Sequence, residues 1–247
     1  MTLKQRIGKW LFVYMPISRF LFDQLRVEWN ALCVSYLNRF SPKQRSRLRR
    51  IREQEAVRVN VACGPDIQPG FVNVDLFAAS PEVVRWDCRW NLPLADSTAV
   101  GIRVEHFLEH LETCEELPGF LGDCWRVLKP EGVLRVVVPD ARKYIEAYLQ
   151  PGLSGFAALN CPVPFPNDLP TRMDAVNHVF HQAHEHRAGY DLESLKHRLE
   201  IAGFVRVTRM SYGKSSDAVL ACDRPMHAPY SLYVEAFKPG VESPPAR

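Results

Sequence analysis

Short apolar runs bounded by turn residues recur through most of the chain, and each has the length of a β-strand. The runs cover residues 57–62, 71–76, 83–86, 99–104, 133–138, 204–210 and 218–222. The run at 133–138 is apolar at nearly every position, which is typical of a strand in a parallel sheet covered by helices. Residues 117–128 and 191–202 instead carry leucines at helical spacing. Strands that alternate with helices predict an α/β fold with a Rossmann-like, doubly wound, mostly parallel sheet.

The first 55 residues follow a different pattern, with apolar residues at helical spacing and no strand-like run. Ser18 can cap a helix, and Ser41 followed by Pro42 predicts the start of another. The apolar stripe of the first of these helices consists of Leu21, Leu25, Leu32, Tyr36 and Phe40. Apolar residues at this spacing are typical of an amphipathic helix.

Charge separates the same two parts of the chain. Residues 1–55 contain twelve Lys and Arg against four Asp and Glu, a net charge of +8, whereas the remaining residues carry a net charge of −5. We therefore expect a basic helical extension over residues 1–55 and one α/β domain over 56–247. An insertion at about 150–190 begins with a stretch rich in Pro and Gly, for which a long loop is predicted.

Three roles for the basic extension are compatible with its sequence. Its helices can pack on the domain or on a second subunit, which would give a homo-oligomer. They can lie on an anionic membrane surface, because they combine apolar stripes with arginines. Binding to nucleic acid is the weakest hypothesis, because no recognition motif accompanies the charge.

The sequence contains no run of roughly 18 to 20 apolar residues, the length that a membrane-spanning helix needs. The apolar run near the N-terminus is short and lacks a small-residue cleavage site. Seven scattered cysteines, without a C-x-x-C pair, favour a reducing compartment. We expect a cytoplasmic protein, and contact with the inner membrane is the alternative that the basic extension leaves open.

Small and acidic residues gather where the predicted strands end. They are the loop Asn60–Gly64, then Asp75, Asp87 and the pair Glu105–His106. Ligands of open α/β sheets bind outside the carboxyl ends of the strands. There Ala62 and Gly64 would let a ligand approach the backbone, Asp75 could accept hydrogen bonds from a ribose diol, and Asp87 could accept one from an adenine amine.

In this order the motifs resemble those of class I S-adenosylmethionine-dependent methyltransferases. The resemblance rests on residues 59–75, on the Leu-Pro turn within Asp87–Ser97, on Glu105–Leu111 with its His-x-Leu-Glu-His pattern, and on Arg126–Gly132 with Val138–Asp140. The most similar group is a bacterial subgroup of predicted methyltransferases linked to surface polysaccharide genes. It implies a seven-stranded sheet whose last strand is antiparallel, with S-adenosylmethionine as the methyl donor.

The resemblance also implies a role for each strand end. The loop residues Asn60, Ala62, Cys63 and Gly64 would face the methionine end of the cofactor. Asp75 would hold the ribose and Asp87 the adenine, whereas Glu105 and His106 would lie near the sulfonium and the acceptor. One departure concerns Ala62, which stands where the family usually has glycine. Alanine there could narrow the approach to the cofactor, which leaves a non-catalytic binding module as one alternative.

Methyl transfer to a hydroxyl also requires removal of a proton, for which histidine is suited near neutral pH. His106 is the first candidate for this base, and His178 is a candidate for the acceptor site. Both can instead be structural, and the cluster His178–His186 lacks an obvious complete ligand set, so we expect no metal site. The predicted function is O-methylation of a sugar, a lipid-linked glycan or a related small acceptor. Methylation of RNA or of a small metabolite is the alternative enzymatic function.

Overall fold

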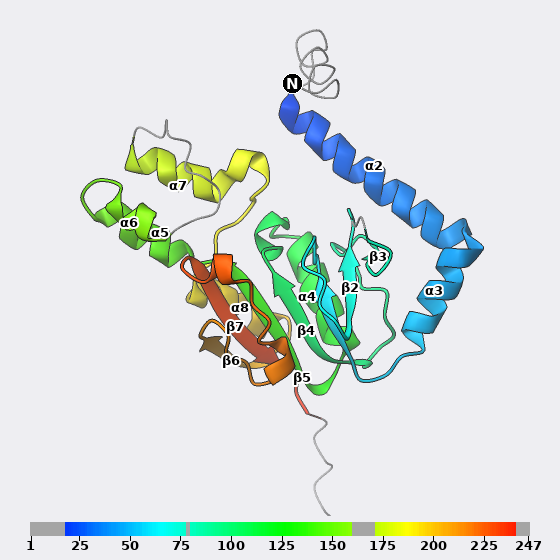
Figure 1. Ribbon diagram of the computed structural model, residues 1–247. Coiled ribbons are helices and arrows are strands. Elements are labelled where there is room, and N and C mark those ends of the chain that lie inside the picture. Colours follow the sequence, from blue (N-terminus) through cyan, green and yellow to red (C-terminus); the bar gives the residue numbers. More distant parts are fainter. Residues whose placement is uncertain (1–17, 78–79, 160–170, 241–247) are drawn as a thin grey trace, which may run out of the picture.

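A seven-stranded sheet forms the centre of the molecule (Figure 1). The computed structural model describes residues 18–77, 80–159 and 171–240. The strands, in the spatial order β3-β2-β1-β4-β5-β7-β6, are β3 (Val84–Arg85), β2 (Phe71–Asp75), β1 (Val57–Val61), β4 (Ala99–Glu105), β5 (Leu128–Pro139), β7 (Ser231–Phe237) and β6 (Val205–Met210). Strands β1 to β5 pair in parallel, whereas β7 is antiparallel to both β5 and β6. The Rossmann-like fold and its antiparallel last strand are confirmed.

The prediction of a strand at 218–222 is wrong. Residues Ala218–Leu220 form a 3-10 helix, η3, whose first turn is capped by the Asp217 carboxylate accepting from the Val219 N–H. The last strand is β7 instead, which was not predicted from the sequence. Its sequence includes Glu235 in the middle, so the apolar pattern that marks the other strands is interrupted.

The helices are α2 (Arg19–Phe40), α3 (Pro42–Arg52), α4 (Glu116–Val127), α5 (Ala141–Leu149), α6 (Ser154–Ala158), α7 (Arg172–His181) and α8 (Leu192–Ile201). Short 3-10 turns lie at η1 (Leu108–His110), η2 (Gln182–His184) and η4 (Pro225–His227). The predicted cap at Ser18 accepts from the Leu21 N–H at 3.2 Å, and Asp191 forms a capping box with Ser194. The Pro- and Gly-rich stretch is not wholly a loop, because it contains α6 and the start of α7.

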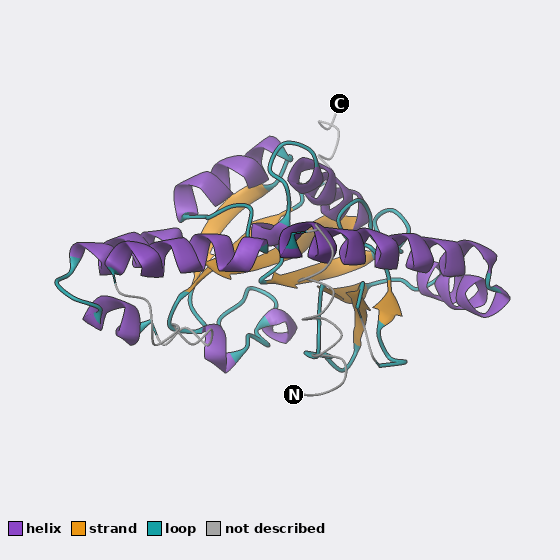
Figure 2. Cartoon of the chain, turned by 90° about the horizontal axis from the view of Figure 1, so that it is seen from above, coloured by secondary structure: helices purple, strands orange, loops and turns teal. Residues whose placement is uncertain are grey.

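One face of the sheet is apolar and is covered by helices. Its side chains come from alternate strand positions such as Val59, Ile102, Leu134 and Val234, and they belong to the main hydrophobic cluster. Helices α4 and α8 contribute to the same cluster, and Figure 2 shows helices on this side of the sheet. Burial of this apolar face is the main source of stability for the domain.

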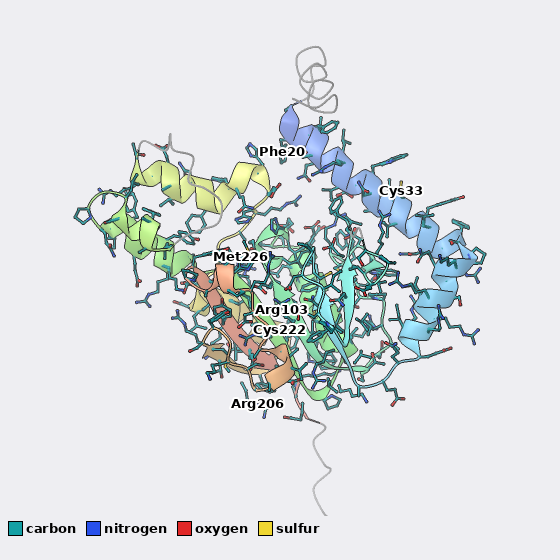
Figure 3. The ribbon with its side chains drawn as sticks, in the orientation of Figure 1. Phe20, Cys33, Arg103, Arg206, Cys222 and Met226 are labelled. Atoms are coloured by element: carbon teal, nitrogen blue, oxygen red, sulfur yellow. The ribbon has the colours of Figure 1, made fainter. Side chains whose placement is uncertain are left out.

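The opposite face carries a row of buried polar side chains that crosses five adjacent strands. This polar row consists of Asn73, Asn60, Arg103, Arg135 and Glu235, which are register partners in adjacent strands. The β1–β2 and β3–β4 connections, residues 62–70 and 86–98, are described throughout and contain no helix. Instead, the long connection between β6 and β7 covers this face, so charged groups replace the usual apolar helix contacts. In Figure 3, Arg103 lies beside the part of that connection that carries Cys222.

Helix α2 turns its predicted apolar stripe outward. Leu32 and Tyr36 are both 64% exposed, and Leu21, Leu25 and Phe40 are exposed as well. The side facing the domain instead contains Val34, which is buried, and Asn38, whose side chain donates to the carbonyl of Arg85. Among the described residues the stripe does not pack on the domain, and the other roles of the extension stay predictions. In residues 18–77, 80–159 and 171–240, no helix is long and apolar enough to cross a membrane.

Candidate active site

A cavity of about 440 Å³ lies at the carboxyl ends of the parallel strands. Four consecutive strands contribute a predicted site residue to its lining: Ala62 follows β1, Asp75 ends β2, Asp87 follows β3 and His106 follows β4. This is the edge of an open α/β sheet at which ligands bind. The structure therefore brings together four side chains that the sequence analysis selected at separate strand ends.

Asp75 connects the loop after β1 to the end of β2. Its carboxylate accepts from the backbone N–H of Gly64 at 2.9 Å and from that of Phe77 at 2.7 Å. Each carboxylate oxygen has a further acceptor position, which leaves capacity for a ribose diol. Gly64 has a φ of +52°, and no atom lies within 4 Å of the position that a Cβ would occupy there. A ligand can therefore approach the backbone of this loop closely.

Ala62 has a φ of +50°, in the left-handed region that favours glycine. This conformation costs an alanine about 1–2 kcal/mol relative to a right-handed or extended one. The observed backbone thus gives a physical reason why glycine would be the commoner residue at this position. The alanine side chain lines the cavity, so it is part of the surface that a cofactor would contact.

Arg89 occupies both carboxylate oxygens of Asp87. Its Nε lies 3.0 Å from Oδ1 and its Nη2 lies 2.8 Å from Oδ2. The same guanidinium reaches α2, where Nη1 lies 2.6 Å from Oε1 of Glu28 and the hydrogen bond lowers the pKa of that carboxyl group. A bond from Asp87 to adenine would have to compete with Arg89, and the adenine role of Asp87 stays a prediction.

The other predicted cofactor residues do not line this cavity. Asn60 belongs to the polar row, where its side chain accepts from Arg103 at 2.7 Å and donates to Asn73 at 3.0 Å. Cys63 is buried, and burial together with the Asp75 charge raises the pKa of its thiol to about 12, which fits a loop residue better than a nucleophile. Gly64 contributes its backbone N–H, which donates to the Asp75 carboxylate.

Glu105 lies on the polar face of the sheet instead of facing the cavity. It forms an ion pair with Arg103, and its Oε1 lies 2.6 Å from Nδ1 of His227. Burial alone would raise the pKa of Glu105, but the hydrogen bond from His227 and the charge of Arg103 hold it below its usual value. Glu105 therefore stabilises the covering connection, and a role near the sulfonium stays a prediction.

Helix α2 covers the cavity, which the sequence analysis did not foresee. Phe20, Gln24 and Val27 line it from this helix. Gln24 accepts from Nη2 of Arg187 at 3.0 Å, and Phe20 meets the ring of His184 edge-on with centroids 5.4 Å apart. In the sequence, the side of α2 that faces the domain is marked only by small and apolar residues at helical spacing, namely Val27, Ala31 and Val34. The apolar walls of the cavity come from Leu76, Phe77, Trp86, Cys88, Phe107 and Leu111.

His106 is held from two sides. Its Nε2 lies 2.9 Å from the hydroxyl of Ser231, and its Nδ1 lies 3.1 Å from Oε1 of Glu109. An imidazole nitrogen this close to a carboxylate carries the proton, because two lone pairs would repel each other. Nε2 is then the acceptor of the ring, and it can receive a hydrogen bond from Ser231. The φ of His106 is +54°, a conformation that histidine and asparagine tolerate better than most residues.

Glu109 is a buried carboxylate surrounded by imidazoles. It is 1% exposed, and neither of its oxygens has a partner with hydrogen-bond geometry among the described residues. The approach of His106 at 3.1 Å is close but lacks that alignment. Burial alone would raise the pKa of Glu109, whereas the neighbouring His106, His110 and His186 lower it to about 2. The carboxylate is therefore ionised near neutral pH.

The structure separates the histidines of the predicted cluster. The side chain of His178 lies outside the described residues, so its acceptor-site role stays a prediction. His181 is exposed, and His184 lines the cavity beside Phe20. His186 is buried and lies against His110, with ring centroids 4.9 Å apart. His110, from the His-x-Leu-Glu-His segment, also lines the cavity.

These features fit S-adenosylmethionine. Asp75 offers acceptors for a ribose, the open loop at Gly64 admits a ligand to the backbone, and the apolar walls can contact a purine face. Asp75 and the apolar walls line one cavity at the strand ends, and Gly64 is joined to it through the hydrogen bond from its N–H to Asp75. The resemblance inferred from sequence and the geometry of this cavity therefore point to the same cofactor.

Comparison with known families gives a consistent result. Residues 50–136 match a family described as a methyltransferase domain, and this span contains β1 to β4 and most of β5. No curated protein matches the chain in sequence.

Several solved structures are similar to this chain. A SAM-dependent methyltransferase from Archaeoglobus fulgidus is 16% identical, with 85% of this chain and 94% of that chain covered and a TM-score of 0.44. An S-adenosylmethionine-dependent methyltransferase from Mesorhizobium loti is 15% identical, with coverages of 78% and 96% and a TM-score of 0.45. A possible histamine N-methyltransferase from Thermotoga maritima is 15% identical, with coverages of 96% and 96% and a TM-score of 0.44. These three likenesses carry no argument about the fold, which rests on the strand order itself. The match over residues 50–136 supports a methyltransferase enzyme with S-adenosylmethionine as its cofactor.

Proposed function

We propose that the chain transfers a methyl group from S-adenosylmethionine to a hydroxyl of a sugar or a lipid-linked glycan. The observation that carries the choice of a hydroxyl is the position of His106 on the cofactor cavity, with Glu109 behind it. A hydroxyl acceptor must lose a proton, and an imidazole oriented by a carboxylate can take it. The saccharide character of the acceptor is supported only by the resemblance to a subgroup linked to polysaccharide genes.

The chemistry divides between the cofactor and the protein. When bound, S-adenosylmethionine would supply the methyl group, and its sulfur would keep the electron pair of the C–S bond as the acceptor oxygen forms the new O–C bond. In the proposal His106 receives the hydroxyl proton at Nε2, where Ser231 is replaced by the acceptor. Glu109 keeps Nδ1 protonated and stabilises the resulting imidazolium. The apolar walls and α2 exclude water, so that the oxygen is desolvated and aligned.

A screen of donor consumption tests this proposal. The purified protein is incubated with the donor and with separate pools of sugars, lipid-linked glycans, RNA and small metabolites. Formation of S-adenosylhomocysteine only with the glycan or sugar pools supports it. Turnover with RNA or with nitrogen-containing metabolites contradicts it, and turnover with no pool despite cofactor binding would favour a non-catalytic binding module.

We further propose that α2 rests on an anionic membrane surface, where a lipid-linked acceptor would lie. The outward stripe of α2 includes Trp29 at 68% and Leu32 at 64% exposed, with Leu25 and Tyr36 on the same side. The net charge of +8 in residues 1–55 complements anionic lipid headgroups. An apolar stripe flanked by positive charge is the pattern of a helix that lies in the membrane interface.

Flotation with liposomes tests the membrane contact. Replacing Leu25 and Trp29 together by glutamate is expected to abolish co-flotation with anionic vesicles, because both the apolar contact and the local charge are lost. Replacing Leu149 and Ile201 by glutamate is a matched control, since both side chains are 73% exposed and lie outside α2. Equal flotation of all three proteins, or equal flotation with neutral and anionic vesicles, would contradict the proposal. Dimerisation through the stripe would likewise contradict it.

A further inference from the structure

We propose that Glu109, His110 and His186 bind a divalent transition-metal ion such as Zn²⁺ beside the cofactor cavity. One ligand atom from each of the three side chains lies within 4.8 Å of the other two. Two imidazoles and one carboxylate form a ligand set that Zn²⁺ and Fe²⁺ both accept. The sequence-based expectation of no metal considered the histidines at 178–186 without the two ligands that lie some seventy residues earlier in the chain.

The backbone holds the two parts of this site together. Glu109 and His110 are neighbours in η1, and His186 follows η2. The carbonyl of Glu109 accepts from the N–H of Arg187 at 2.7 Å and from that of Ala188 at 3.3 Å. The residue after His186 is thus hydrogen-bonded to the residue that carries the carboxylate. This pairing fixes the approach of the three side chains before any ion binds.

A backbone contact of His110 fixes its tautomer in the form that a metal ligand needs. Its Nδ1 lies 3.0 Å from the carbonyl oxygen of Glu185, so this nitrogen must donate, and Nε2 carries the lone pair. Metal-binding histidines commonly donate their other ring N–H to a backbone carbonyl, which fixes the tautomer and strengthens the ligand. The T-shaped contact of His110 with His186 brings the second imidazole to the same place.

The burial of the Glu109 carboxylate supports the metal site independently of the distances between the ligand atoms. Glu109 is 1% exposed, and among the described residues neither of its oxygens has a partner with hydrogen-bond geometry, His106 being close but not aligned. Such a carboxylate is costly to bury unless a positive group compensates it. A divalent cation between the carboxylate and two neutral imidazoles provides that compensation. Tetrahedral coordination places ligand atoms about 3.3 Å apart, so the side chains would close slightly around the ion.

Three protein ligands leave one coordination position of a tetrahedral ion open. His110 lines the cofactor cavity, so the open position would be close to the acceptor. In a role that rests on the proposed O-methylation, the ion would bind the acceptor hydroxyl and lower its pKa, which makes the oxygen a better nucleophile. The ion site itself does not depend on that role.

Calorimetric titration with Zn²⁺ tests the site, using untagged full-length protein that has been treated with a chelator. We expect one saturable site per chain, and at least about a tenfold loss of affinity in His186→Gln and in Glu109→Gln. His184→Gln is the matched control, because His184 belongs to the same segment but not to the ligand set, and it should bind Zn²⁺ as the wild type does. A titration of each variant with S-adenosylhomocysteine shows separately whether the protein is folded and whether the cofactor assignment holds.

Absence of saturable Zn²⁺ binding by the wild type in the micromolar range would overturn the metal site while leaving the methyltransferase assignment intact. Wild-type affinity in both His186→Gln and Glu109→Gln would also overturn it. Conversely, metal binding that follows the predicted pattern, without turnover on any hydroxyl acceptor, would support the ion site and reject only the proposed function.

Discussion

Replacing Asp223 by alanine is expected to lower the free energy of unfolding by about 3–5 kcal/mol, because it leaves the charge of Arg135 buried without its main partner. The Nε and Nη2 atoms of Arg135 lie 2.9 and 2.6 Å from the two carboxylate oxygens of Asp223. Both side chains are completely buried. Glu235 still contacts Nη1 at 2.9 Å, so the guanidinium would keep one acidic neighbour and lose the other.

Urea denaturation, monitored by circular dichroism, measures this loss of unfolding free energy. Asp96→Ala is the control, because Asp96 also forms an ion pair with an arginine, Arg126, but its side chain is 77% exposed. An exposed pair is worth about 0–1 kcal/mol, so this variant should unfold nearly as the wild type does. If Asp223→Ala is no less stable than Asp96→Ala, the polar face is not sealed by the β6–β7 connection in the way that we describe.

The second large effect concerns catalysis. His106→Asn is expected to lower kcat by about 10²–10⁴-fold, the usual contribution of a general base, while the affinity for S-adenosylhomocysteine stays the same. Asparagine is chosen because it tolerates the left-handed backbone at this position, which alanine would strain. Turnover is measured with the acceptor that the donor-consumption screen identifies.

His197→Gln serves as the control, because His197 lies on α8 away from the cavity. It should retain wild-type kcat and cofactor affinity. Loss of cofactor affinity in His106→Asn that matches its loss of kcat would contradict a catalytic role and indicate that the imidazole merely holds Ser231 and Glu109 in place. An unchanged kcat would exclude the base entirely.

The sequence predicted the parts of the fold that depend on local pattern. The strands at 57–62, 71–76 and 133–138 are short and mostly apolar, and each was found within a residue or two, apart from the earlier start of β5 at Leu128. The cavity residues Asp75 and His106 could be selected because strand ends of a parallel sheet meet at one edge. In these cases the local signal and the tertiary structure agree.

The features that could not be predicted from the sequence depend on contacts between distant segments. Arg135 and Glu235 interrupt apolar strands, and only the sheet register shows that they are partners in a buried row. The outward stripe of α2 has the same period as a buried one, so the pattern could not show which side faces the domain. His186 lies near Glu109 because the N–H of the next residue, Arg187, donates to the Glu109 carbonyl, and no spacing rule encodes that contact between distant segments.

The central claim is that the cavity at the strand ends binds S-adenosylmethionine through Asp75. Calorimetric titration with S-adenosylhomocysteine tests it most directly, with the wild type and Asp75→Ala compared under the same conditions. We expect saturable binding of one ligand per chain, weakened by about 1–3 kcal/mol in the variant because hydrogen bonds to the ribose are lost. Equal affinity of the two proteins would reject the role of Asp75, and no binding by the wild type at millimolar ligand would contradict the cofactor site itself.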